Sequence, residues 1–323
     1  MRVVVAPADA GERADKVVTS ALAIAVPAEP ISRATVQRWM RAGRVLAADG
    51  TALTDPSQKL RAGLELVVSP EPPPRSEAAP DPSIAVTILF EDDDLIIVDK
   101  PAGLVVHPAR GHETGTLVNG LLGRSLTVAG DDEDWRMRPG IVHRLDKGTS
   151  GVMVVAKNPF TREALRVRFA AHDLERRYVA IVVGAARDAT IETLYGRDAR
   201  ERMRFTTFVR EGKRAVTHVR VREPLKHATL VACTLETGRT HQIRVHLAER
   251  MKTPVLGDPV YGSPPTDREL RALAAELGHQ ALHAELLGFE HPRTREPMRF
   301  TSAPPVDFQR ALALLRGATR PSI

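Results

Sequence analysis

The sequence predicts a large α+β domain around a central, mainly antiparallel sheet, preceded by a small α/β domain. The chain has 323 residues, which is longer than the roughly 100–200 residues of a usual single domain. Strand-like and helical stretches are mixed along its C-terminal part, and such a mixture is typical of α+β folds. A proline-rich segment divides this part from the N-terminal residues.

The proline-rich segment covers residues 70–83 and contains six prolines without a periodic apolar pattern. Such a segment stays extended and is a poor core builder, so we interpret it as a linker. We therefore expect domains at residues 1–69 and 84–323. With 43% hydrophobic and 27% charged residues, the chain has a normal globular balance and enough material for a substantial core.

In the small domain, Ser32 is a predicted N-cap for a helix over residues 33–41, with Val36, Trp39 and Met40 at helical spacing. Asp49-Gly50 predicts a tight turn, and residues 64–68 predict a closing strand. Between residues 31 and 45 there are four arginines and no acid: Arg33, Arg38, Arg41 and Arg44. These arginines form either a solvated helix face or a surface that contacts phosphates.

In the large domain, buried strands are predicted over residues 95–98 and 151–156, and an alternating strand over 230–235. Asn158-Pro159 predicts the start of a helix, because asparagine caps helices and proline is favoured at their first position. Leu165 and Phe169 lie one turn apart on that helix.

The overall charge indicates the kind of partner. Lysine and arginine number 46 against 40 acidic residues, a net charge of +6, which favours polyanionic partners because bound phosphates release counterions. Cys233 is the only cysteine, so disulfides within the chain and thiolate metal sites are excluded. Residues 1–7 are too short an apolar run for a signal peptide, and no stretch of 18 apolar residues occurs. We expect a cytoplasmic protein without a membrane span.

The most informative polar segment spans residues 138–151. Its polar side chains are packed between apolar, strand-like runs, and loops on a rigid scaffold often carry catalytic groups. They are His143, Arg144, Asp146, Lys147, Thr149 and Ser150. From the residues alone, Asp146 beside a basic neighbour is either a structural ion pair or a catalytic carboxylate.

A second polar segment spans residues 236–246, where Thr240 is a predicted N-cap and Ile243, Leu247 and Met251 repeat at helical spacing. Its two histidines are five residues apart, so on a helix they point roughly 140° away from each other and do not predict a metal site. Arg244 is either a surface charge or a cation that faces a carboxylate or phosphate.

Tyr178 is one of only three tyrosines and precedes an apolar run. It either packs at a sheet edge or offers its ring to a base extruded from RNA. The sequence contains no G-x-S-x-G elbow, no Walker loop and no G-x-G-x-x-G.

Taken together, these residues resemble the RluA-type pseudouridine synthases over nearly the whole large domain. The characteristic blocks are His143-Arg144-Leu145-Asp146 with Thr149-Ser150-Gly151, Asp99-Lys100-Pro101-Ala102-Gly103, Arg177-Tyr178-Val179-Ala180, and residues 238–246. Within the family the chain is similar to the large-subunit ribosomal RNA synthase D branch, on residues 107–108, 115–119, 257–262 and 280–284. One departure is Gly148, at a position where the family usually has an acidic residue.

Residues 11–69 resemble an S4-type RNA-binding module. The matching residues are Arg13-Ala14-Asp15, Ser32-Arg33, Gly43-Arg44-Val45, Asp49-Gly50 and Gly63. Ala14 and Asp49 depart from the leucine and asparagine that are usual there.

These resemblances imply an RNA isomerase with a pseudouridine synthase fold. Uridine and pseudouridine are isomers, so the reaction needs no cofactor, group donor or metal. Asp146 is the implied nucleophilic or acid–base carboxylate. Arg144 fills the space left by the flipped base, and Tyr178 packs against that base and assists proton removal. Arg244 pairs with Asp146 and keeps it ionised. The implied RNA contacts include Arg33, Arg38, Arg41 and Arg44 of the small domain.

The branch similarity implies that the substrate is 23S ribosomal RNA or the assembling large subunit, and we expect a monomer. Two alternatives remain open at this stage. The same chemistry on transfer RNA would use the same catalytic blocks, whereas a catalytically silent ribosome assembly factor would be favoured by loss of the Asp146 motif, which is present.

Overall fold

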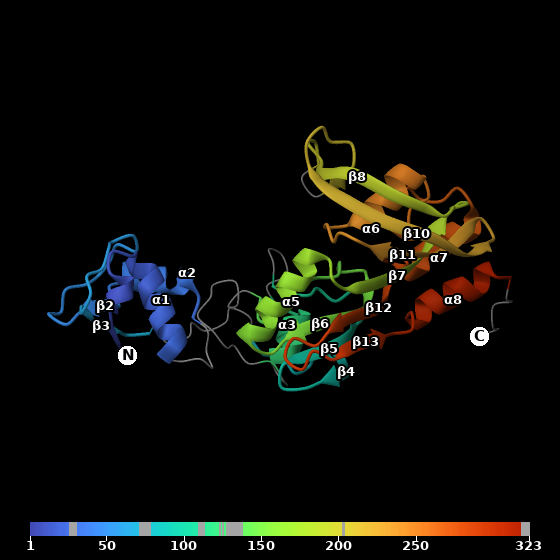
Figure 1. The fold of residues 1–323 in the computed structure, drawn as a ribbon. Helices are drawn as coiled ribbons and strands as arrows, with labels where there is room; N and C mark the ends of the chain where they lie inside the picture. Colours follow the sequence, from blue (N-terminus) through green and yellow to red (C-terminus); the bar gives the residue numbers. More distant parts are fainter. Residues whose placement is uncertain are drawn as a thin grey trace.

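The computed structural model describes residues 1–25, 31–70, 79–108, 114–122, 124, 126, 138–201 and 204–317. Figure 1 shows the elements coloured along the chain. Residues 71–78, most of the proposed linker, lie outside this described part.

The N-terminal unit has its own sheet and core. A three-stranded antiparallel sheet has the order β1-β3-β2, and Trp39, Met40 and Leu66 are buried between it and the helices. The predicted cap is confirmed, since Ser32 Oγ accepts the Thr35 N–H at 3.1 Å. The predicted turn is also confirmed, with Gly50 at φ +85°. The elements are β1 (Arg2–Val4), η1 (Pro7–Asp9), α1 (Ala14–Ala25), α2 (Arg33–Arg41), β2 (Val45–Ala47) and β3 (Glu65–Val68).

The large unit contains a ten-stranded sheet that is antiparallel except for one pairing. The strand order is β4-β5-β6-β12-β7-β11-β10-β8-β9, and β13 also pairs with β12. This confirms the predicted mainly antiparallel sheet. The strands are β4 (Thr87–Glu91), β5 (Leu95–Lys100), β6 (Ser150–Ala156), β7 (Glu175–Val183), β8 (Ala189–Arg197), β9 (Phe205–Thr206), β10 (Lys213–Leu225), β11 (Ala228–Leu235), β12 (Leu282–Glu290) and β13 (Pro297–Thr301).

Both faces of the first part of the sheet are covered, which explains why its strands are apolar throughout. Successive side chains of a strand point to opposite faces. Leu95 and Ile97 of β5 pack in the cluster of α5 (Pro159–Ala171), whereas Ile96 and Val98 pack in that of α3 (Leu117–Leu122). The predicted start of α5 is confirmed, because Asn158 Oδ1 accepts the Thr161 N–H at 2.9 Å.

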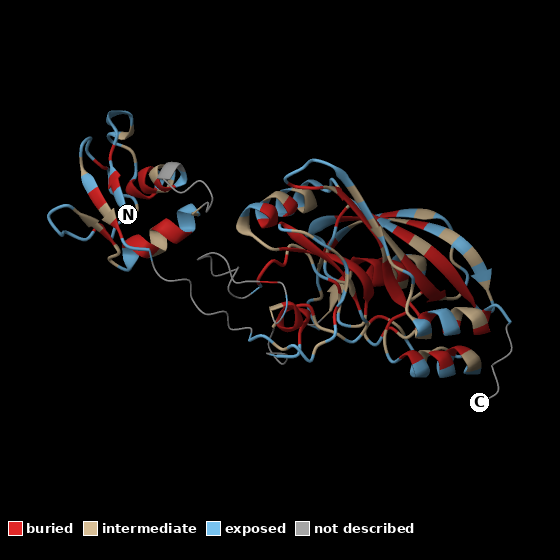
Figure 2. Ribbon diagram, turned by 90° about the horizontal axis from the view of Figure 1, so that it is seen from below, coloured by how far each residue is buried: buried red, intermediate tan, exposed pale blue. Residues whose placement is uncertain are grey.

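The second part of the sheet is covered by α7 (Arg268–Leu277) and α8 (Val306–Leu315), whose apolar residues join the cluster of β7, β11 and β12. Figure 2 shows buried residues concentrated on the central strands and exposed residues along the outer sides of these helices. No helix within the described ranges is long and apolar enough to cross a membrane.

The predicted cap at Thr240 is wrong. The helix begins one residue later than Thr240 would cap, because His241 occupies the left-handed region at φ +60° and makes no capping hydrogen bond. Instead, the side chain of Gln242 folds back and accepts the Arg239 N–H at 3.0 Å. The short helix α6 (Gln242–Val245) then continues as the π-helix η2 (His246–Met251), a rare helix type that often occurs at functional sites.

The only parallel pairing between strands of the large sheet, within the described residues, joins the two parts of the sheet. It runs between β6 and β12 and spans two residue pairs, Ser150 with His283 and Gly151 with Ala284. Gly151 has φ +116°, and a Cβ there would lie 2.2 Å from the Ala284 carbonyl oxygen. Because only glycine fits this approach, the start of β6 is fixed directly after the loop that carries Asp146.

Candidate active site

Asp146 lies in the loop that leads into β6. Its backbone carbonyl accepts the Thr149 N–H at 3.0 Å, which closes a turn, and its side chain keeps 17% of its surface exposed. The carboxylate is therefore fixed by the loop and still reachable from solvent.

Arg244 of α6 holds this carboxylate from the other part of the sheet. Its Nη1 donates to Asp146 Oδ2 at 2.8 Å. Its Nε and Nη2 donate to the two oxygens of the buried Asp258, at 2.7 and 2.8 Å. Burial alone would lower the pKa of Arg244, but the two carboxylates raise it. The guanidinium is thus a permanent cation whose orientation is set by the bidentate pair. Of the two interpretations left open by the sequence, the structure shows the one in which Arg244 faces a carboxylate.

A buried lysine, Lys100, holds the loop that carries Asp146. Lys100 is fully buried, and its ammonium donates to the carbonyls of Pro101 and Leu104, both at 2.8 Å, and of Lys147 at 3.2 Å. Burial lowers the pKa of Lys100 to about 7, although the charge of Asp146 acts to raise it. Lys100 therefore ties the residue directly after Asp146 to the end of β5.

A histidine and a tyrosine border the same carboxylate. His241 Nε2 is 3.7 Å from Asp146 Oδ1, and His241 Nδ1 shares a 2.9 Å hydrogen bond with the Tyr261 hydroxyl. Burial lowers the pKa of His241, with Asp146 acting in the opposite direction, so the imidazole is neutral at pH 7. The guanidinium carbon of Arg244 lies over the Tyr261 ring, 5.2 Å from the ring centroid. The two histidines of this segment have separate partners, since His246 bonds Thr193 and Thr217.

Three other polar residues of the motif have partners within the fold: His143, Thr149 and Ser150. His143 stacks on Phe169 at 4.5 Å, and its Nε2 accepts the Val154 N–H at 3.1 Å. Burial, with a smaller effect of the Arg176 charge, lowers the pKa of His143 to about 3. Thr149 Oγ1 accepts a hydrogen bond from Gln280 at 3.0 Å, and Ser150 bonds His283 at 2.9 Å.

Gly148, the departure from the family pattern, packs against Gln280. A Cβ at position 148 would lie 2.4 Å from Gln280 Oε1 and 2.9 Å from the Cβ of His279. The absence of a side chain therefore matches the local packing of this loop.

Two further predicted residues, Arg144 and Tyr178, interact electrostatically with residues of the site. Arg144 is exposed on the same loop, and its charge is one cause of the lowered pKa of His241. Tyr178 lies on β7, partly buried between the two core clusters of the large unit. Its pKa is raised chiefly by burial, and the charge of Asp146 also contributes.

The four arginines of the small domain differ in their surroundings. Arg33 Nη2 donates to the buried carboxylate of Asp15 at 2.9 Å, which also receives Gln37 at 2.6 Å. Arg38 and Arg44 are half-buried, and Arg41 is exposed. Thus Arg33, although exposed, has a structural partner, and Arg41 is exposed as well.

The sequence alone indicated no role for three residues of the site: Lys100, Asp258 and Tyr261. Each of them belongs to a block that carries the family resemblance, but the resemblance did not say what its side chain contacts. The signal for Asp258 is a short polar segment, residues 257–262, between apolar runs. Its pairing with Arg244 follows only from the folded chain.

The sequence comparison identifies the class of protein that carries this mixed, mainly antiparallel sheet and the contact between Asp146 and Arg244: the RNA pseudouridine synthases. Residues 94–249, which include both Asp146 and Arg244, match the family described as RNA pseudouridylate synthase. The chain belongs to the RluA-type family of RNA pseudouridine synthases, and it is therefore an enzyme of that activity.

Two bacterial relatives match most of the chain. The uncharacterized RNA pseudouridine synthase YlyB of Bacillus subtilis (strain 168) is 42% identical over 287 residues, which is 88% of this chain and 90% of the relative. The ribosomal large subunit pseudouridine synthase D of Xanthomonas campestris pv. campestris is 43% identical over 296 residues, 88% of this chain and 85% of the relative.

A solved structure shares the fold. The human RNA pseudouridylate synthase domain containing 4 matches with a TM-score of 0.55 and 24% identity, over 71% of this chain and 93% of the human one.

Proposed function

We propose that this enzyme isomerises specific uridines of 23S ribosomal RNA to pseudouridine, with Asp146 as the catalytic carboxylate. The reaction breaks the bond between C1′ and N1, joins C5 to C1′, and moves a proton from C5 to N1. The observation that carries the proposal is the Asp146–Arg244 contact at 2.8 Å, with Arg244 itself held in place by Asp258.

The three neighbours of Asp146 have distinct proposed roles. Arg244 orients the carboxylate of Asp146 through a charge-assisted hydrogen bond. Arg144 enters the space that the target base leaves when it flips out of the stack. Tyr178 packs against the flipped base. Because burial raises the pKa of Tyr178, its phenol keeps its proton at neutral pH, which favours the packing role over direct proton removal.

The ribosomal target is supported by the relatives named as large subunit synthases D, at 39–43% identity. We propose that residues 1–69 form an S4-like module that anchors the enzyme on large RNA, and that the enzyme works as a monomer in the cytoplasm. The outward-facing Arg41 supports this role for the small domain.

The Asp146→Asn substitution tests the catalytic role. The amide keeps the shape of the side chain but cannot act as a nucleophile or general base. We expect no turnover, with unchanged melting and RNA binding. Appreciable activity of the pure, undeamidated Asp146→Asn protein would overturn the mechanism.

Mapping pseudouridines in ribosomal and transfer RNA, with and without the gene, tests the substrate. We expect the loss of defined sites in 23S RNA. Loss confined to transfer RNA would replace the ribosomal target but leave the chemistry in place, and no loss anywhere would contradict both.

A further inference from the structure

A row of aromatic rings leads outward from the catalytic carboxylate. Tyr261 is joined to His241 beside Asp146, and its hydroxyl accepts the Phe205 N–H at 3.0 Å. The chain then continues to Phe208, at most about 11 Å of extended backbone beyond Phe205. Basic side chains lie against all three rings: Arg204 on Tyr261 at 5.4 Å, Arg197 on Phe205 at 5.1 Å, and Arg250 on Phe208 at 4.3 Å.

The outermost ring is exposed but rigidly held. Phe208 keeps 63% of its surface exposed, although the residue before it is fixed by the π-helix η2. Glu249 accepts both the N–H and the hydroxyl of Thr207, at 2.7 and 2.5 Å. Arg250 donates to the hydroxyl and the carbonyl of Thr207, at 2.8 and 2.7 Å. The ring is therefore presented to solvent in one place instead of collapsing onto the protein.

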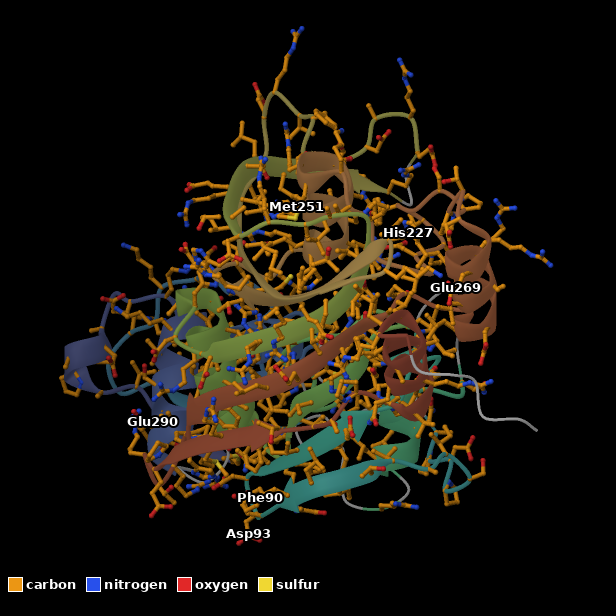
Figure 3. The ribbon with its side chains drawn as sticks, turned by 90° about the vertical axis from the view of Figure 1, so that its right-hand side faces the viewer. Phe90, Asp93, His227, Met251, Glu269 and Glu290 are labelled. Atoms are coloured by element: carbon orange, nitrogen blue, oxygen red, sulfur yellow. The ribbon has the colours of Figure 1, made fainter. Side chains whose placement is uncertain are left out.

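A groove lies next to this ring, along one edge of β8. Its volume is about 520 Å³, and Thr207, Val209, Arg250 and Met251 line it opposite residues 189–194 of β8. Ala189–Tyr195 pair with β10 on one edge, and within the described part of the chain no strand pairs with their other edge. Figure 3 labels Met251, the last residue of η2.

The charge of the groove identifies the kind of ligand. The exposed cations Arg187 and Arg250 line the groove, and the exposed Lys252 has its Nζ 5.8 Å from the Phe208 ring centre. Of the nearby acids, Glu249 accepts hydrogen bonds from Thr207, and Glu192, which lines the groove, pairs with Arg214 at 2.7 Å. An exposed aromatic ring flanked by cations is the arrangement with which proteins bind single-stranded nucleic acid, because each base stacks while the cations neutralise the backbone.

We propose that Phe208, Arg250 and Lys252 form a stacking platform for an unpaired nucleotide that flanks the target uridine in the RNA substrate. The helical segment formed by α6 and η2 carries Arg244 near one end and Arg250 near the other, and Lys252 follows directly after it. An RNA strand bound on the platform is therefore held in a fixed relation to Asp146. The inference rests on the chain's acting on RNA, and it does not depend on the catalytic role of Asp146.

The test measures binding in the full-length Asp146→Asn protein, so that turnover cannot interfere. The probe is fluorescein-labelled oligouridylate of 12 nucleotides, with duplex RNA of the same length as comparison. Stacking contributes about 1–3 kcal/mol per base, so Phe208→Ala should weaken oligouridylate binding about 5-fold to 150-fold. Duplex binding should change less, because its bases are already stacked, and Phe208→Tyr should bind as the parent does.

Phe160 provides the matched control. It is also an exposed phenylalanine, at 45%, with the Arg293 guanidinium 5.1 Å from its ring, but it lies on α5, outside the row of rings. Phe160→Ala should leave oligouridylate affinity unchanged. Lys252→Gln should lower the slope of log affinity against log salt by about 0.7, the value for one contact to a single strand.

Unchanged affinity of the folded Phe208→Ala protein would overturn the proposal and would favour the open edge of β8 as a site for an extended peptide. If affinity falls in that protein, the platform stands even where Asp146→Asn retains turnover. The two hypotheses therefore fail separately.

Discussion

Arg244 connects two carboxylates, so its replacement by methionine is expected to affect both stability and rate. The side chain of Asp258 is completely buried, and that of Arg244 keeps only 4% of its surface exposed. Removing one partner of such a pair typically costs about 3–5 kcal/mol, because the other charge stays buried. Asp258 retains hydrogen bonds from the N–H groups of Val260 and Tyr261. We therefore expect the lower end, about 3 kcal/mol.

The loss should depend on pH in a defined direction. Burial acts to raise the pKa of Asp258, but the hydrogen bonds and charge of Arg244 keep it below its usual value. A carboxyl with a lowered pKa stabilises the fold above about pH 4. Without Arg244, burial dominates and the pKa of Asp258 rises, so unfolding then releases protons. The stability difference between wild type and Arg244→Met should therefore be larger at pH 7 than at pH 5.

Urea unfolding followed by circular dichroism measures the stability, and single-turnover kinetics measure the rate. Arg244→Lys is the control, because an ammonium restores charge but cannot hold Asp258 with two prongs and reach Asp146 as well. It should recover only part of both losses. A methionine variant with wild-type stability and rate would refute the role of Arg244 as the link between the two carboxylates.

The further predictions concern Lys100 and Gly148 in the large unit and the arginines of the small domain. The free energy of unfolding of the wild type should rise between pH 7 and 10. The cause is Lys100, which is buried with a pKa of about 7 and so binds fewer protons in the folded than in the unfolded chain; the rise is at most about 5 kcal/mol. Lys100→Met should lack this rise, so the same pH dependence of unfolding in both proteins would contradict the prediction. Gly148→Ala should destabilise the protein by about 1–3 kcal/mol, since its Cβ would displace Gln280; an unchanged melting temperature would show that the loop yields. A chain that starts at Ala79 keeps the hydrogen bonds of residues 79–81 to Asn119, and it should modify a short RNA but bind long RNA more weakly. In the full chain, Arg41→Gln should reduce the salt slope, whereas Arg33→Gln should mainly lower stability through loss of its Asp15 contact; equal slopes for wild type and Arg41→Gln would argue against phosphate contact there.

Local signals in the sequence predicted the local structure well. The caps at Ser32 and Asn158 were predicted because a cap depends only on neighbouring residues. The core strands were predicted from their runs of apolar residues. The predicted cap at Thr240 was wrong because the adjacent His241 adopts a left-handed conformation. In that conformation His241 contacts Tyr261 and Asp146, which are distant in the sequence. Propensity alone does not predict such a conformation.

The site was predictable only in part for the same reason. From the residues alone, Asp146 and Arg244 each had a plain structural alternative, and only the family resemblance joined them across 98 positions. From the sequence alone, Lys100 is an ordinary charged residue at the end of an apolar strand. Its burial and its three carbonyl acceptors arise when the loop after Asp146 folds over it, and no spacing rule expresses that.

The two-residue parallel contact between β6 and β12 also affects how the enzyme is assembled. Asp146 precedes β6, in the first part of the sheet, whereas Arg244 follows β11, in the second. Either part folded alone would carry only one of these two residues. Because closing such a long loop costs conformational entropy before native contacts compensate for it, the pair forms only when both parts have docked. The contact between Asp146 and Arg244 is therefore a product of the completed sheet and of neither part alone.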